Sequence, residues 1–114
     1  MVNNFGQEVL VGDYVLYSLK SGYLDIYLVY KFSEGNTRAS LLKFHVRKTQ
    51  WIPGPNGVGG QHEPIEPYAI MEKTQAHYPE SMFRTRLEED RRMDPLLYQA
   101  FDEARRKILN GQKV

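Results

Sequence analysis

Two runs of alternating apolar and polar residues, separated by a short polar segment, constrain the fold of this chain more than any other feature. The first run, residues 24–32, places five apolar side chains on one face: Leu24, Ile26, Leu28, Tyr30 and Phe32. Within residues 38–48, Leu42, Phe44 and Val46 repeat the same period. A period of two is typical of β-strands with one buried face. Because only residues 34–37 form the polar segment between the runs, they predict an antiparallel hairpin.

A shorter apolar segment, residues 8–17, precedes this hairpin and is interrupted by Gly12-Asp13. A glycine inside an apolar run predicts a bend or bulge rather than one straight strand. The stretch Val11–Val15, VGDYV, resembles the opening of small SH3-like barrels, including KOW-type and Tudor-type modules. The resemblance covers residues 5–48 and leaves out the remainder of the chain. It implies a strongly bent hairpin and a binding role, because such barrels bind RNA, DNA, ribosomes or peptides far more often than they catalyse.

Residues 53–67 contain four prolines and four glycines. Each proline removes a backbone donor and restricts the residue before it, whereas each glycine adds backbone freedom. We therefore expect a long loop over residues 53–67, mobile at its tip, residues 56–60. Residues 49–52 either extend the preceding strand or begin another, and residues 68–71 are expected to form a short last strand.

The end of the chain is predicted to be α-helical. Asp94-Pro95 is an N-cap followed by a proline at the first helical position. An apolar stripe at helical spacing follows, formed by Leu97, Phe101, Ala104 and Ile108. Asn110-Gly111 is a plausible stop signal. A second, less regular helix is expected over residues 79–93.

These elements predict a single α+β domain, residues 1–114, with a β part (1–52), the loop (53–67) and a short strand with helices (68–114). The sheet is expected to be small, antiparallel and strongly bent, or closed as an SH3-like barrel, with the C-terminal α-helices packed on it or beside it. Cysteine is absent, and 114 residues can bury a core without disulfides or metals. The sequence shows no leader pattern and no run of roughly 20 apolar residues, so we expect a cytoplasmic protein without a membrane segment.

Motifs for catalysis and metal binding are missing from the sequence. His45, His62 and His77 are widely spaced and no cysteine accompanies them. Neither a nucleophile elbow nor a phosphate-binding glycine loop occurs. The acidic run 88–90 is typical of a solvated helix face. We therefore expect no metal, no cofactor and no enzymatic activity, and keep an enzyme with an unrecognised site as the minor alternative.

One group of side chains near the end of the second alternating run suggests a binding surface. Its members, with one residue of the neighbouring strand, are Lys43, His45, Arg47, Lys48, Trp51 and Tyr27. The first three share one face of a strand and form a row about 13 Å long at ~3.3 Å per residue. Such a row could track phosphates while Trp51, or an outward Tyr27, stacks on a base. The alternative is structural, because cations commonly cover the solvent face of an edge strand and Trp51 would then plug one end of a barrel.

Two functions remain open at this point. The first is a non-enzymatic module that contacts nucleic acid, DNA or RNA, through the cationic strand and Trp51. The second is a protein-interaction or regulatory module that binds a host or assembly protein, and the general character of the chain also suits an accessory protein of a phage or mobile element. The net charge of +1 is not that of a dedicated nucleic-acid binder. The exposure of Trp51 and the charges around it are expected to separate the two.

Overall fold

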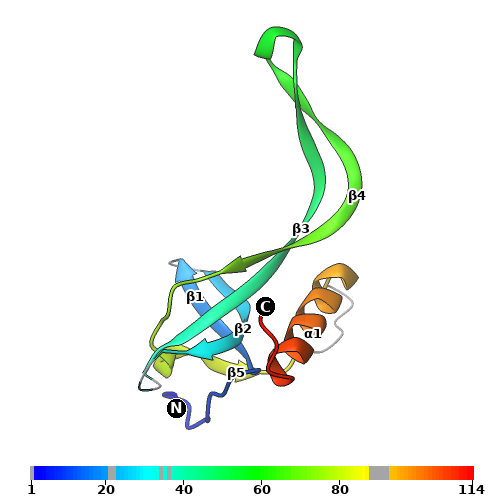
Figure 1. Ribbon diagram of the computed structural model, residues 1–114. Helices are drawn as coiled ribbons and strands as arrows, with labels where there is room; N and C mark the ends of the chain where they lie inside the picture. The colour runs from blue at the N-terminus through cyan, green and yellow to red at the C-terminus, as the bar shows by residue number, and fades with distance from the viewer. Residues whose placement is uncertain (1, 21–22, 34, 36, 88–92) are drawn as a thin grey trace.

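The structure is a computed structural model that describes residues 2–20, 23–33, 35, 37–87 and 93–114. Over these residues, five strands form one open antiparallel sheet in the order β4-β3-β2-β1-β5, and one α-helix follows near the C-terminus (Figure 1). The elements are β1 (Tyr14–Lys20), β2 (Tyr23–Phe32), β3 (Ala39–Pro53), β4 (Gly60–Lys73), β5 (Phe83–Thr85) and α1 (Pro95–Leu109). Two short 3-10 turns lie at Pro55–Gly57 and Pro79–Ser81. The predicted α+β class is confirmed.

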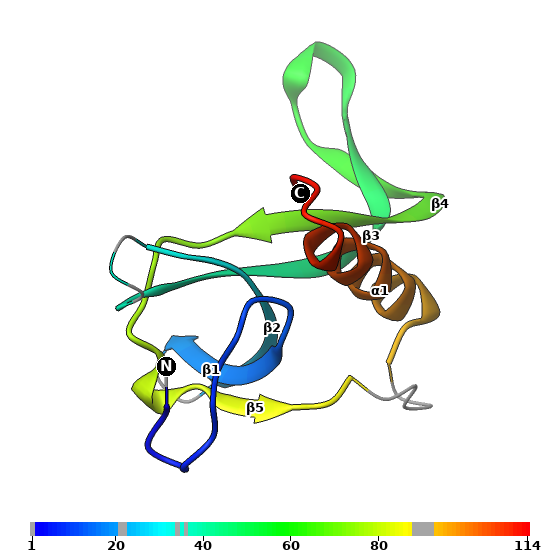
Figure 2. The same ribbon diagram turned by 60° about the horizontal axis from the view of Figure 1, so that its bottom comes forward.

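The sheet is covered on both faces where β2 crosses the body of the protein. One buried cluster contains Val9, Val15, Tyr27, Val29, Ala39, Leu41 and Met82, and the other contains Tyr14, Leu28, Leu42, Phe101 and Ala104. Helix α1 covers the second face (Figure 2). The prediction of an outward Tyr27 is wrong, since its side chain is 1% exposed. Alternation within β2 does not reveal that Val9 and Met82, from distant parts of the chain, cover the face that Tyr27 occupies.

The bend predicted at Gly12-Asp13 is confirmed. Gly12 has a φ of +93°, a conformation that favours glycine, and the Leu10 amide donates to the Asp13 carboxylate over 2.8 Å. Strand β1 therefore begins only at Tyr14, after the bend. The Gly12 amide also donates to the Val29 carbonyl over 2.8 Å, which fixes the bend to β2.

Helix α1 begins and ends where the sequence predicts. The Asp94 side chain accepts a hydrogen bond from the Leu96 amide over 2.9 Å, as an N-cap does. Phe101 and Ala104 are buried, and Phe101 packs edge-on against two aromatic rings, Tyr14 at 5.9 Å and Phe44 at 5.1 Å. The helix stops at Asn110, and Gly111 follows with a φ of +74°.

The second predicted helix, over residues 79–93, is wrong in its described part. Residues 79–81 form a 3-10 turn, Met82 is buried, and residues 83–85 form β5. Strand β5 pairs with β1, with Thr85 opposite Tyr14 and Phe83 opposite Leu16. This pairing joins segments that are far apart in the sequence, so the local pattern of apolar residues does not predict it. Residues 88–92 of the predicted helix lie outside the described residues.

The loop predicted over residues 53–67 is wrong for most of its length, because residues 60–67 belong to strand β4 and pair with β3. Strand β4 is an edge strand, so the amide that a proline lacks can fall on the unpaired side. The register is interrupted between Arg47, opposite Tyr68, and Thr49, opposite Pro64. Lys48 therefore faces three residues of β4, residues 65–67, in a bulge with two extra residues. Only residues 54–59 form a turn, closed by a Gly54 amide that donates to the Gly59 carbonyl over 3.0 Å.

Beyond the body, β3 and β4 continue as a two-stranded ribbon (Figure 1). We call residues 47–68 the arm. The protein measures 56 × 27 × 26 Å, and its radius of gyration of 16.9 Å exceeds the roughly 13 Å of a compact chain of this length. Most side chains of the arm are exposed, and none is buried. The arm therefore has no hydrophobic core of its own. None of the described helices is long and apolar enough to cross a membrane.

Candidate binding surface on the arm

The register of the ribbon places the predicted row on one face. In an antiparallel pair, directly opposed residues point to the same side. Lys43, His45, Arg47 and Trp51 lie opposite Glu72, Ile70, Tyr68 and His62, in that order. We call His45, Arg47, Trp51, His62 and Tyr68 the binding face of the arm. Lys48 lies at the bulge and points to the other side, where its Nζ is 3.5 Å from a carboxylate oxygen of Asp94 at the start of α1.

Acidic side chains neutralise the lower part of the row. The Lys43 Nζ lies 3.7 Å from an Asp25 carboxylate oxygen and 3.9 Å from one of Glu72. The His45 Nδ1 lies 3.2 Å from the other oxygen of Glu72. Exposed pairs of this kind contribute little to stability, but they cancel charge locally. Among the described residues Arg47 has no ion pair, so the row is continuous in geometry and interrupted in charge.

Trp51 faces outward. Its side chain is 54% exposed, and its ring meets the His62 imidazole edge-on at a centroid distance of 5.3 Å. Gly60 lies directly beneath the indole, because a Cβ at this position would collide with Trp51 Cζ2 and lie 2.7 Å from the Ile52 carbonyl oxygen. His62 Nδ1 is in turn 3.4 Å from the Thr49 hydroxyl. The indole is therefore exposed yet held in place, and it does not plug a barrel.

Residues 45–51 and His62 line an open hollow of about 610 Å³ on the arm. Four of the six predicted residues, His45, Arg47, Lys48 and Trp51, line this hollow, although the Lys48 side chain points to the other side of the ribbon, toward Asp94. Lys43 lies just below it, and Tyr27 is buried in the body. Sequence analysis missed Tyr68, which is 46% exposed opposite Arg47. A strand over residues 68–71 was predicted, but its pairing with β3, which places Tyr68 opposite Arg47, was not.

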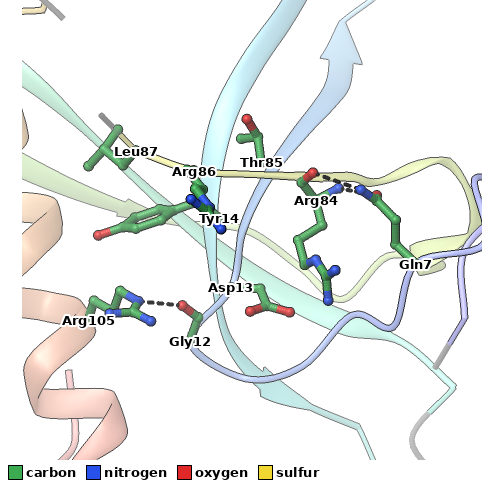
Figure 3. A pocket seen from close by; sticks show the side chains of 9 residues that line it. All are labelled: Gln7, Gly12, Asp13, Tyr14, Arg84, Thr85, Arg86, Leu87 and Arg105. Carbon is green, nitrogen blue, oxygen red and sulfur yellow. Dashed lines mark hydrogen bonds between the residues drawn. The ribbon is translucent and has the colours of Figure 1, made fainter. Parts of the chain in front are cut away.

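A second hollow of about 600 Å³ lies in the body, between the Gly12 bend, β5 and α1 (Figure 3). Three arginines line it, Arg84, Arg86 and Arg105. Two of them already donate to backbone carbonyls: Arg84 Nη1 to Glu8 and Arg105 Nε to Gly12, over 2.8 and 2.9 Å. Figure 3 also shows the carboxylate of Asp13 between these two arginines. The arginines hold the segment before β1 against β5 and α1, and we interpret this hollow as structural.

Tyr14, on the wall of the same hollow, lies between β1 and α1. Burial raises the pKa of its hydroxyl to about 12, although the nearby Arg105 guanidinium acts in the opposite direction. Its ring packs against Phe101 in the cluster under α1. The raised pKa thus reflects the packing of α1 on the sheet.

Among the described residues, no group of three or more histidine, aspartate and glutamate side chains lies close enough to hold a metal ion. His45 and His62 belong to the arm, whereas His77 packs against Tyr17 in the body. Comparison with known proteins adds no family: no protein-family model, no curated protein and no solved structure matches this chain.

Proposed function

We propose that this protein is a non-enzymatic binding module that docks on a protein partner through the binding face of its arm. One observation carries the proposal: a ribbon without a core of its own projects from the body and exposes Trp51 and Tyr68 on either side of Arg47. Tryptophan, tyrosine and arginine are the residues that dominate the energy of protein–protein contacts. Exposed aromatic side chains that a local scaffold holds in place lose little conformational entropy on binding.

The charge of the arm favours a protein over a nucleic acid. Residues 47–68 carry two cations, Arg47 and Lys48, against two carboxylates, Glu63 and Glu66, which gives a formal charge of zero with neutral His62. Affinity for nucleic acid depends on the number of phosphates that cations neutralise. A neutral ribbon lacks this driving force, whereas protein interfaces are depleted of charge at their centre. The charge balance thus reverses the order of the two functions predicted from the sequence.

Nucleic acid remains a second candidate because of Arg47. Its guanidinium has no ion pair among the described residues and lies between His45 and Trp51 along the binding face. A two-stranded ribbon fits the major groove of DNA, and an exposed indole stacks on unpaired bases. In that role Arg47 would contact a phosphate or a guanine, and Trp51 a base.

The resemblance to SH3-like barrels supports a binding role over a catalytic one. Strands β1 to β4 follow one another across the sheet and β5 returns to pair with β1, an order that suits such a module. In this proposal the body is the scaffold, and the extension of β3 and β4 is the part specific to this chain. An accessory role in a phage or mobile element fits a small scaffold of this kind and rests on the general character of the chain.

Capture of partners by the immobilised full chain tests the proposal. We would compare the wild type, the double variant Trp51→Ala/Tyr68→Ala and the control Leu24→Ala, whose side chain is 71% exposed on β2 outside the arm. With nuclease-treated lysate, we expect the double variant to retain at least about tenfold less of a partner protein than the other two, since such contacts exceed ~2 kcal/mol. Equal retention by all three would refute the protein proposal.

A titration with single-stranded and duplex DNA and RNA tests the second candidate. Binding that weakens steeply with salt and disappears in the variant Lys43→Glu/Arg47→Glu would establish nucleic acid as the ligand of the arm. Absence of binding at low salt would exclude it.

A further inference from the structure

One edge of the arm, formed by β3, lies open. Strand β2 pairs with β3 only from Phe32 opposite Ala39 to Leu28 opposite Leu42. Beyond Leu42, the described pairing of β3 is with β4 alone, so the backbone groups on its other side have no strand partner up to the tip. Residues 47–51 are all exposed. Alternate amides and carbonyls of this segment therefore face solvent, the arrangement that accepts an added strand.

The opposite edge of the ribbon, formed by β4, is protected. Pro64 and Pro67 have no amide hydrogen, and the bulge at residues 65–67 breaks the regular spacing that a neighbouring strand requires. By contrast, residues 47–52, RKTQWI, contain no proline, and Thr49, Trp51 and Ile52 are residues that favour strands. The two edges of the arm thus differ in their capacity to pair.

The two edges also differ in charge. Both cations of the arm, Arg47 and Lys48, lie on β3, and both carboxylates, Glu63 and Glu66, lie on β4. The arm is neutral as a whole, but an incoming strand beside β3 would lie next to Arg47, which has no ion pair among the described residues, and next to Lys48, whose Nζ is 3.5 Å from an Asp94 carboxylate oxygen. Opposite charges on adjacent strands stabilise pairing and like charges oppose it.

We infer that the β3 edge, residues 47–52, binds an extended acidic segment of the partner protein as an added β-strand. This inference rests on the proposed function and specifies how the arm would engage its partner. Alternate side chains of the added strand would lie beside Arg47, Thr49 and Trp51 on the binding face, so a strand with carboxylates at alternate positions, one of them beside Arg47, fits best.

A second copy of this chain fits the edge less well than an acidic partner. Parallel pairing of β3 with β3 of another copy would bring Arg47 and Lys48 of both chains together, and like charges on neighbouring strands are destabilising. Antiparallel pairing over residues 47–52 would place Arg47 opposite Ile52 and provide no carboxylate for it. Pairing of β3 with β4 of another copy would require the edge that Pro64 and Pro67 block. The structure therefore favours a different chain as the occupant.

Two synthetic peptides provide the direct test with the full-length protein. The acidic probe is Thr-Glu-Val-Glu-Val-Glu-Thr, and the matched basic probe has lysine in place of each glutamate. Trp51 is the only tryptophan, so its emission reports on the edge without a label. At a concentration about ten times its Kd, the acidic probe should shift this emission to the blue and slow exchange of alternate amides in residues 47–52 about tenfold. The basic probe should do neither up to about 1 mM.

Two controls separate strand addition from binding through side chains alone. The acidic probe has two sets of alternate residues, and each set can be N-methylated in a separate peptide. One of these peptides should lose binding and the other should keep it, because only every second amide faces β3. The variant Arg47→Glu should lose the acidic probe at least tenfold, whereas Lys113→Glu, an exposed charge reversal outside the arm, should keep it.

Three results would overturn the inference. They are no protection of residues 47–52 by the acidic probe at about 1 mM, equal effects of both N-methylation patterns, and protection of this edge by self-association without any probe. Each leaves the capture experiment unaffected. A partner that depends on Trp51 and Tyr68 but not on the β3 edge would sustain the proposed function while this inference fails.

Discussion

Two glycine-to-alanine substitutions test whether the arm is energetically separate from the body. Gly12 and Gly57 both have positive φ values, +93° and +73°, in which a residue with a Cβ is strained. Gly12 lies in the bend before β1, where its amide donates to Val29 and its carbonyl accepts from Arg105. Gly57 lies in the turn at the tip of the arm, with no atom within 4 Å of an added Cβ. The chemical change is the same, and only the location differs.

The expected loss of stability follows from where the strain sits. An alanine held at positive φ costs about 1–3 kcal/mol. At Gly12 the added Cβ would also lie 2.8 Å from Leu109 Cδ2, but this exposed side chain can move away. We therefore expect Gly12→Ala to lower the free energy of global unfolding by about 2 kcal/mol, which for a domain of this size lowers Tm by about 8 °C.

At the tip of the arm, the local stability of the arm limits how much the same strain can lower the stability of the whole domain. Strain at one residue lowers the free energy of global unfolding in full only if its segment stays folded until the whole domain unfolds. If the segment unfolds earlier, most of the strain does not affect global unfolding. A two-stranded ribbon without a core is marginally stable by itself. Gly57→Ala should therefore accelerate amide exchange in the arm, leave the exchange of body amides unchanged and lower Tm by less than about 2 °C.

Thermal unfolding followed by circular dichroism, together with amide exchange, measures both quantities. If Gly57→Ala lowered Tm as much as Gly12→Ala, the arm would unfold together with the body. The arm would then not be energetically separate from the body, and its exposed residues would contribute to folding of the whole domain.

Further substitutions probe the body. Phe101→Ala removes the ring between Tyr14 and Phe44 and should destabilise the domain by about 3–5 kcal/mol in chemical denaturation, whereas an unchanged midpoint would contradict the packing of α1 on the sheet. Asp94→Ala removes the N-cap of α1 and should cost about 1 kcal/mol in the same assay, with Asp94→Asn, which can still cap, as the control. Because the pKa of Tyr14 is raised from 10.0 to about 12, the unfolded chain loses this proton first, so stability should fall as the pH rises from 10.0 toward 12. Tyr14→Phe should reduce that fall, and an equally steep fall in the variant would rule Tyr14 out as its source.

Local sequence patterns predicted the elements whose stabilising contacts are close in the chain. The cap at Asp94, the stripe through Phe101 and Ala104, and the stop at Gly111 each act within a few residues, and α1 follows them closely. The alternation in β2 and β3 likewise predicted their hairpin. Both β5 and the burial of Tyr27 depend on contacts between distant segments, which no local pattern contains.

The first part of strand β4, residues 60–67, was missed because Gly60, Pro64 and Pro67 give it the composition of a loop. Whether a proline excludes a strand depends on the side of the strand to which its missing amide would point. Its sequence alone does not say that β4 is an edge strand, and it does not reveal the bulge opposite Lys48. The missing strand pairing also limited the prediction of the candidate site. The row of Lys43, His45 and Arg47 was predicted, but the contacts of Glu72 with Lys43 and His45 were not. Glu72 becomes a neighbour of this row only when β4 pairs with β3.

The features that concealed β4 also make the ribbon asymmetric. A two-stranded ribbon extending into solvent has two open edges, and either one invites unspecific pairing with other chains. Pro64 and Pro67 oppose pairing along the β4 edge, and in the binding mode proposed above the β3 edge at Arg47 takes an acidic strand. An arm that served only to stabilise the body would bury Trp51 and Tyr68 rather than expose both on one face. The composition that resembles a loop is thus what a ribbon with a single binding edge requires.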